Sequence, residues 1–416
     1  MVTGEKKRTS MAPAAARRLA LHAQLLDGRS KLPRGKEGVA RTIEKLGYVQ
    51  IDTIAVIERA HHHTLWTRRP DYHPDMLHEL QTVDRRVFEY WGHAASYLPM
   101  SDYRYYLPRM RGFEEPHHKW EKQRLEKYAQ LMPGVLERIR KEGPLSSKDF
   151  IPPQKKKGGG WWEWRPTKVA LELLFWRGAL MITERRNFHR IYDLTERVLP
   201  SGIDTTLPTK EELGRFLVRR ALAAYGIARE REIREHIHGH DKAIITQALH
   251  DLLDSGEVAT VTVGLDKDAV YYALSTSLEK AAGLKKRTPR VHLLSPFDNL
   301  IIQRERLQSL FGYDYVLECY TPAARRQYGY FTLPILWGER FVGRLDPKAE
   351  RKQRTLVVRS SQFESDIKES DRFYQALAHK LGDLARFNGC DEISVGGCSP
   401  ATVKRTLQAA LKKARP

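Results

Sequence analysis

Twice along the chain, an amphipathic helix ends at a glycine and a pair of short strands follows. The first case has a helix over 166–177, then Gly178 and a strand pair within 181–194. The second has a helix that reaches Gly256 and a strand pair within 259–274. Another helix precedes each of them. A recurring order of this kind predicts repeated small units that pack on one another, in place of one large sheet or one helical bundle.

The N-terminal part of the chain has a related pattern. Apolar residues recur at helical spacing over 14–26 and 36–47, and residues 48–53 are expected to be extended. Helices are expected over 54–66 and near 76–90. Helices that are joined by short turns and closed by a strand pair are the ingredients of a helix-turn-helix or winged-helix unit. The sequence therefore predicts three such units in series.

From residue 291 onward the pattern changes to alternating strands. Strands are expected over 328–338, 339–348 and 354–361, and helices over 371–386 and 401–413. We interpret this part as a small β-rich domain. The whole chain is then an α+β protein with four predicted domains, at 1–130, 131–205, 206–290 and 291–416.

The charge of the chain indicates an anionic partner. Lys and Arg number 71 against 51 Asp and Glu, so the net charge is +20 and the pI is near 9.8. Neutralising phosphates releases condensed counterions, which favours binding of a basic protein to a polyanion. The alternative is that the excess charge serves only solubility, or reflects a basic proteome.

The hydropathy pattern predicts a cytoplasmic, nucleoid-associated protein. The longest apolar runs, such as 169–176, are far shorter than the roughly 20 residues that span a bilayer. Near the N-terminus Arg17, Arg18 and His22 interrupt the run that a signal peptide needs.

Neither a metal nor another cofactor is expected. Cys319, Cys390 and Cys398 have no CxxC spacing, which argues against a zinc site and against a disulfide framework. The run from His61 to His63 resembles a metal site, but three consecutive helical residues cannot all face one ion. A solvated or packed His cluster is the better interpretation.

Several segments resemble the YcaQ-type branch of the winged-helix DNA glycosylases, a superfamily that includes the AlkZ self-resistance enzymes. They occur in the family's order and are 50-QIDTI-54, 89-EYWGHAASYLPMSDYR-104, 161-WWEWRP-166, 184-ERRNFHRIYDLTERVLP-200, 295-SPFDN-299, 318-ECYTPAARRQYGYFTLP-334 and 343-GRLDPK-348. The resemblance covers residues 50 to 348.

The resemblance implies three tandem winged-helix motifs and a C-terminal β-barrel-like domain around a basic channel. It also implies a monomeric enzyme of DNA repair. Its substrates would be double-stranded DNA with cationic N7-alkylated purines and with interstrand crosslinks joined through such bases. The sequence departs from the family at one point, because Ala94 follows His93 where relatives often have an acidic residue.

The family's Gln-apolar-Asp signature falls on Gln50 and Asp52. In an extended segment, residues two apart project from the same face, so both side chains can reach one point while Val49 and Ile51 turn into the core. The alternative is that Asp52 caps a helix that begins near Thr53.

A glycosidic bond breaks through an oxocarbenium-like transition state. The carboxylate of Asp52 is expected to stabilise the developing positive charge and to deprotonate the attacking water. Gln50 has a donor and an acceptor with which to hold that water. A second carboxylic acid is not needed if the leaving purine already carries a positive charge. With no lysine standing out as a Schiff-base nucleophile, a monofunctional enzyme is expected.

Further residues are candidates for contact with DNA. Their roles would be stacking or phosphate binding near the lesion, phosphate contact from wings and a loop, and backbone contact from a predicted hairpin. They are His93, Tyr90 and Trp91; Arg185 and Arg186 with Lys155, Lys156 and Lys157; and Arg325, Arg326 and Tyr328. Packing of Tyr90 and Trp91 in a core, and a structural role for 161-WWEW-164, are the alternatives.

Two other functions have the same general features. A winged-helix transcription regulator also combines such units with positive charge, but it is normally a dimer with a recognition helix and has no use for a Gln50 and Asp52 pair. A non-catalytic DNA-binding protein would be indifferent to replacement of Asp52.

Overall fold

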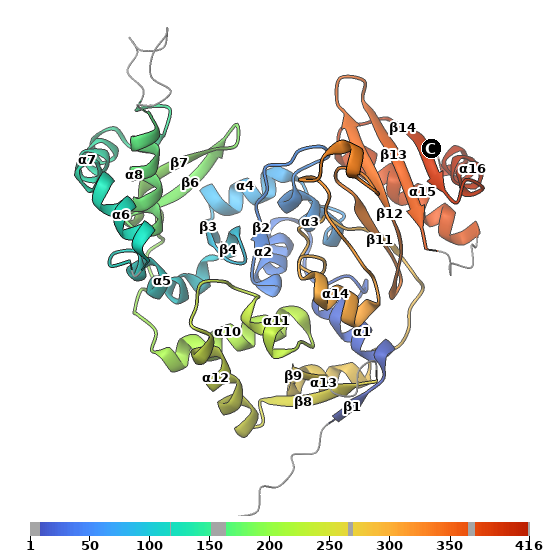
Figure 1. The fold of residues 1–416 in the computed structure, drawn as a ribbon, viewed down its shortest axis with the longest axis horizontal. Helices are drawn as coiled ribbons and strands as arrows, with labels where there is room; N and C mark the ends of the chain where they lie inside the picture. Colours follow the sequence, from blue (N-terminus) through green and yellow to red (C-terminus); the bar gives the residue numbers. More distant parts are fainter. Residues whose placement is uncertain (1–8, 117, 151–163, 265–268, 365–370, 415–416) are drawn as a thin grey trace, which may run out of the picture.

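The computed structural model of the 416-residue chain describes residues 9–116, 118–150, 164–264, 269–364 and 371–414. In these ranges the chain forms four β-sheets with helices packed around them. Three sheets are small and three-stranded, and the fourth has five strands and lies at the C-terminal end. Figure 1 shows the helices and strands of residues 35–99 in the middle, between the 132–198 segment at one end and the five-stranded sheet at the other.

The first unit follows the order helix, short strand, two helices and a strand pair. Its elements are α2 (Gly35–Leu46), β2 (Val49–Gln50), α3 (Ala60–Arg68), α4 (Pro74–Thr82), β3 (Val87–Trp91) and β4 (Ala95–Pro99). The antiparallel sheet has the order β2-β4-β3, so the first strand pairs with the last. A segment without helix or strand, residues 51–59, joins β2 to α3.

The second and third units have similar orders. The second contains α7 (Met132–Glu142), β5 (Leu145–Ser146), α8 (Trp164–Trp176), β6 (Leu180–Arg186) and β7 (His189–Leu194), with sheet order β5-β7-β6. The third contains α10 (Lys210–Tyr225), α11 (Glu230–Arg234), α12 (Lys242–Asp254), β8 (Val258–Val263) and β9 (Val270–Leu274). A single bridge from Ala228 to Tyr272 takes the place of its first strand.

Shorter elements connect these units and flank them. They are β1 (Thr9–Met11), α1 (Pro13–Ala23), η1 (Met100–Tyr106), α5 (Leu107–Gly112), α6 (Lys119–Tyr128), η2 (Ala129–Leu131), α9 (Thr195–Val198) and α13 (Ser275–Ala282). Although β1 is N-terminal, it pairs in parallel with β8 of the third unit. The four predicted domain boundaries stay predictions.

The predicted β-barrel is wrong, because the C-terminal sheet is open. Its elements are β10 (Val291–Leu293), α14 (Arg304–Phe311), η4 (Ala323–Arg325), β11 (Leu333–Trp337), β12 (Arg340–Glu350), β13 (Thr355–Phe363), α15 (Asp371–Phe387), β14 (Glu392–Ser399) and α16 (Val403–Ala414). The strands follow one another from β10 to β14, and the two outer strands are not paired with each other in the described ranges. α15 crosses back along the sheet and lets β14 join β13 in parallel.

Two predicted helices have different bounds. Residues 54–59 are not helical, since α3 begins only at Ala60, and the helix predicted near 76–90 ends at Thr82. Residues 87–90 instead form strand β3, whose partner β4 supplies the hydrogen bonds that a single sequence does not reveal. The strand pairs predicted within 181–194 and 259–274, and the helix over 371–386, are confirmed.

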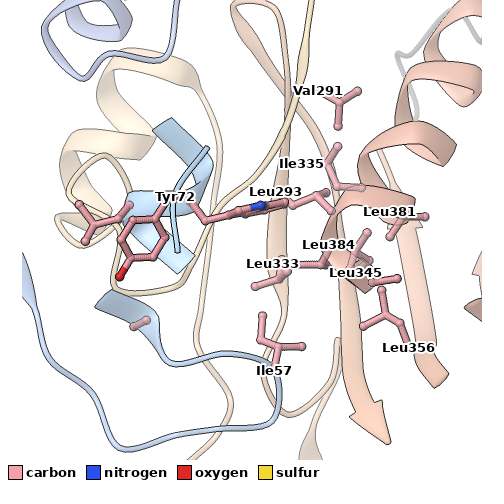
Figure 2. Close-up of a cluster of buried hydrophobic side chains, with 14 of the residues drawn as sticks. Ile57, Tyr72, Val291, Leu293, Leu333, Ile335, Leu345, Leu356, Leu381 and Leu384 are labelled. Carbon is pink, nitrogen blue, oxygen red and sulfur yellow. The ribbon is translucent and has the colours of Figure 1, made fainter. Parts of the chain in front are cut away.

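A large apolar core joins the first unit to the C-terminal sheet. Figure 2 shows side chains from both parts meeting in it, among them Ile57, Leu293, Leu333 and Leu384. All four are fully buried. Because this core lies directly behind the 51–59 segment, the position of that segment depends on both parts of the chain.

A buried ion pair holds the same two parts together. Arg68 at the end of α3 donates to both carboxylate oxygens of Asp298, at 2.6 and 2.9 Å, and neither side chain is exposed. The guanidinium also donates to the backbone and side-chain oxygens of Gln24. Beside Asp298, the Nδ2 atom of Asn299 donates to the carbonyl of Tyr48, one residue before β2. This network fixes the start of the strand that carries Gln50.

Replacement of Asp298 by asparagine is expected to destabilise the protein by about 3–5 kcal/mol, because it leaves the Arg68 guanidinium buried without a counter-charge. Chemical unfolding with urea measures this loss. The matched control is Asp391→Asn, which breaks the exposed ion pair with Arg354 and should change stability far less, since exposed ion pairs contribute little. Equal effects of the two substitutions would contradict the expectation.

Candidate active site

Gln50 ends strand β2, with its backbone opposite Ser96 of β4. The next backbone N–H, that of Ile51, donates to the carbonyl of Ala95 at 2.8 Å. The Gln50 side chain is 8% exposed, and its Oε1 atom has no hydrogen-bond partner in the described part of the chain. A buried acceptor without a partner is uncommon and costly in proteins. Gln50 therefore offers an acceptor that a ligand or a water can satisfy.

Asp52 follows two residues later, at the start of the 51–59 segment. Its Oδ1 atom accepts the backbone N–H of Ile54 at 2.7 Å, which makes a tight local turn. Since α3 begins at Ala60 and its N-cap residue is Arg59, the alternative that Asp52 caps this helix is wrong. Burial raises the pKa of Asp52, and the hydrogen bond from Ile54 opposes that shift in part. Within the described ranges, no Lys, Arg or His side chain contributes to the pKa shift of this carboxylate.

A loop of the C-terminal domain lies within electrostatic reach of Asp52. Burial and, after it, the charge of Asp52 raise the pKa of Cys319. The neighbouring Tyr320, whose pKa is raised by Cys319, by burial and by Asp52 in that order, is 85% exposed. An exposed aromatic side chain therefore stands near the candidate carboxylate.

Two carboxylates that our sequence analysis missed hold this loop. Glu318 accepts the backbone N–H groups of Gln327, Tyr328 and Gly329, and Asp346 accepts those of the next two residues. Hydrogen bonds to backbone N–H groups help to keep the pKa of Glu318 low, against the opposing effect of burial. The sequence could have indicated both carboxylates, because Glu318 and Asp346 lie in segments that resemble the family.

A groove of about 660 Å³ lies between the start of the 51–59 segment and the second unit. Ile51, Thr53 and Ala95 line one wall. The facing wall comes from the second unit, and its basic members are Lys148, Lys168, Arg185, His189 and Arg190. Ile51 and Thr53 thus line the groove, whereas Gln50 and Asp52, which alternate with them along the chain, do not.

A family model described as DNA glycosylase AlkZ-like matches residues 43–387, which include all of these features. The chain belongs to the AlkZ-like DNA glycosylase family. The fold of this glycosylase is similar to that of the Streptomyces sahachiroi DNA glycosylase AlkZ, with a TM-score of 0.64 and 16% sequence identity. The match covers 94% of this chain and 100% of the Streptomyces chain. Enzymes of this family cleave N-glycosyl bonds of DNA and act in DNA repair.

His93 lies in the hairpin turn between β3 and β4 and faces the third unit of the glycosylase. Its Nδ1 atom donates to the carbonyl of Glu235 at 2.9 Å. The ring stacks on Tyr48 at 5.9 Å and contacts His238 at 4.2 Å. Burial, the largest cause, lowers the pKa of His93. A partly buried ring in this setting favours a neutral imidazole over a phosphate-binding cation.

The structure favours packing over DNA contact for the neighbouring aromatic residues. Tyr90 is 2% exposed, and its hydroxyl donates to the carbonyl of Trp176 at 2.6 Å. The Tyr90 ring also meets Phe175 edge-on, which joins the first and second units. This burial disfavours the predicted contact of Tyr90 with DNA, which stays a prediction. Trp91 is partly buried, and its carbonyl accepts from Arg109.

The predicted phosphate contacts of the second unit have different surroundings. Arg185 forms a two-point ion pair with Glu89 of β3, at 2.8 and 2.7 Å, and is therefore already neutralised. Arg186 is exposed and donates to Glu184 at 2.8 Å. The predicted contacts Lys155, Lys156 and Lys157 lie outside the described residues, as do 161–163 of the Trp-rich segment.

The predicted strands over 328–338 and 339–348 do form a hairpin, β11 with β12, but its first strand begins only at Leu333. Residues 328–331 are a loop, because the side chains of Glu318 and Asp346 accept the backbone N–H groups that a partner strand would otherwise bind. Arg325 is exposed there, at the end of η4. Arg326 donates to the carbonyl of Thr321 and lies 4.8 Å above the Tyr330 ring. The Tyr328 ring contacts Arg344, at 4.1 Å.

Metal binding and membrane insertion find no support in the residues described. Those ranges contain no group of three His, Cys, Asp or Glu side chains placed to hold a metal ion. Their helices include none that is both long and apolar enough to cross a bilayer. Cys319, Cys390 and Cys398 are free cysteines.

Asp52→Asn is expected to stabilise the glycosylase at neutral pH. A carboxyl group whose pKa is raised by folding destabilises the folded state at pH values above that pKa, and it has no effect below the unfolded value near 4. The gain in unfolding temperature should therefore be present at pH 7 and shrink as the pH falls toward 4. Thermal unfolding of both proteins across this range measures it, and a less stable variant at pH 7 would contradict the expectation.

Proposed function

We propose that this glycosylase hydrolyses the N-glycosidic bond of cationic N7-alkylated purines in double-stranded DNA, with Asp52 and Gln50 as its catalytic residues. One observation carries the proposal: among the described residues, a half-buried carboxylate without a cationic partner stands two residues from a buried amide oxygen without a hydrogen-bond partner. Family membership favours this enzyme over a transcription regulator and over a non-catalytic DNA-binding protein.

The chemistry needs one carboxylate. As the bond between C1′ and N9 breaks, its electron pair returns to the purine ring and cancels the positive charge that alkylation of N7 created. The sugar gains positive charge, which Asp52 stabilises, and water attacks C1′ while Asp52 takes its proton. Gln50 holds this water through its free oxygen. The products are a neutral alkylated purine and an abasic site.

The same bond cleavage unhooks an interstrand crosslink that is joined through N7 of a purine. Because water is the nucleophile, the enzyme is monofunctional and leaves the strand uncut. The three units act as tandem winged-helix motifs, an interpretation supported by their shared element order and by sheets in which the first strand pairs with the last. The enzyme acts as a monomer, on nucleoid DNA in the cytoplasm.

Base release should depend on both catalytic residues. On duplex DNA containing N7-methylguanine, Asp52→Asn is expected to lower the single-turnover rate by about 100-fold or more, and Gln50→Ala by about 10-fold or more. Chromatographic detection of the released base measures these rates. Binding of the same duplex should change less than about threefold in both variants.

The leaving group provides the control. An undamaged adenine duplex should yield no detectable base, since a neutral purine leaves with its electron pair uncompensated. Release of adenine at a comparable rate would contradict the single-carboxylate chemistry, and an active Asp52→Asn variant would contradict the role of Asp52.

The basic groove contributes phosphate contacts. Lys148 is exposed on its wall, and Arg190 projects from β7 beside it. The logarithm of the binding constant falls linearly with the logarithm of the salt concentration, and each contact with a phosphate should add about 0.9 to the magnitude of that slope. Lys148→Ala and Arg190→Ala are expected to lower that slope by about one unit each. The matched control is Lys413→Ala in α16, and slopes unchanged in the groove variants would argue against DNA contact there.

A further inference from the structure

The hairpin of the second unit has an unfavourable residue at its tip. β6 and β7 are joined by only two residues, Asn187 and Phe188, because Arg186 pairs directly with His189. Both tip residues have positive φ, 48° and 67°. This is a type I′ turn, for which Asn-Gly is the preferred pair. Asparagine tolerates the left-handed region, but a bulky aromatic residue there is a true outlier.

The Phe188 ring makes contacts that account for its presence. The guanidinium of Arg59 lies 4.2 Å from the ring centroid and that of Arg185 lies 4.5 Å from it. The His61 ring stacks on it as well, at 6.1 Å and 17°. Arg185 also donates to the Phe188 carbonyl, and its charge is anchored by Glu89 of the first unit. The strained turn is thus held from both units.

These contacts reach the segment that carries Asp52. Arg59 is the last residue of the 51–59 stretch, and Phe188 lines the same groove as Ile51 and Thr53. From the opposite side, Arg351 donates to the carbonyls of Ala55 and Ile57. The C-terminal sheet therefore holds the middle of the segment, while the hairpin of the second unit holds its end. Strain of this kind persists where the surrounding structure requires it, often near functional sites.

We propose that Phe188 is a positioning residue: its ring, clamped by Arg59 and Arg185, fixes the 51–59 segment and so holds the Asp52 carboxylate in its working position. This inference rests on the proposed function of Asp52. A loosely held carboxylate loses rate because small displacements of a reacting group are costly to catalysis.

Phe188→Gly separates the ring from the turn. Glycine gives the turn its preferred Asn-Gly pair, so the hairpin should keep its fold while the clamp is lost. Single-turnover release of N7-methylguanine is expected to fall about 10-fold or more, with the Kd of the same duplex changed less than about threefold. Phe188→Tyr, which keeps an aromatic ring at this position, should release the base at the rate of the unaltered protein.

Amide hydrogen exchange tests the inference independently of catalysis, and the pH dependence of the rate adds a second readout. Amide hydrogen exchange of the 51–59 segment should be faster in Phe188→Gly and unchanged in Phe188→Tyr. The acid limb of the rate profile should move to lower pH, because water that reaches a loosened Asp52 returns its raised pKa toward the ordinary value.

Asn187→Gly is the matched control, since it places a glycine in the same turn but keeps the ring. It should match the unaltered protein in rate and in exchange. The inference is overturned if Phe188→Gly exchanges like the unaltered protein, or if Asn187→Gly shows the same loss. An unaltered protein that releases no alkylated base would refute the proposed function alone, and the exchange measurement would still decide the role of Phe188.

Discussion

The buried ion pair between Arg68 and Asp298 links parts of the chain that are 230 residues apart. Charges removed from water are costly unless their geometry is excellent and their remaining donors are satisfied. Here the guanidinium is satisfied by Asp298 and by Gln24, and the adjacent Asn299 binds the carbonyl of Tyr48. These contacts fix how the first unit packs against the C-terminal part of the chain. In this arrangement the loop after Glu318 lies close to Asp52.

Against this rigid background, the candidate active site contains unfavourable interactions. Gln50 buries an amide oxygen that has no hydrogen-bond partner in the part of the chain that the structure describes, and Asp52 has a carboxyl group whose pKa is raised by burial. At the tip of the neighbouring hairpin, Phe188 occupies backbone space suited to glycine. Natural proteins tolerate such features where function needs them and where well-packed regions supply the stability. All three features meet at or beside one short segment of the chain, residues 50–59.

Local pattern predicted much of the fold. A helical pattern that ends at a glycine correctly predicted the two strand pairs that follow it, β6 with β7 and β8 with β9. These elements are neighbours in sequence, so the pattern that predicts them is local. The pattern failed where partners are distant. Residues 87–90 follow helical residues without a break in pattern, and their strand is decided by β4. The barrel-like domain was expected from the resemblance to the family, but α15 places β14 in parallel beside β13 and leaves the sheet open.

For the site, the sequence alone determined the alternation that sets Gln50 and Asp52 apart from Val49 and Ile51, because side-chain direction along an extended chain depends only on spacing. It also determined the positive charge and the motifs that define the family. Only the tertiary structure decided that Tyr90 is buried, that Glu89 neutralises Arg185, and that Glu318 and Asp346 shape the loop near Asp52. Those outcomes depend on which side chains meet across long sequence separations. The residues next to a charged or aromatic side chain in sequence do not indicate which distant residue it will contact.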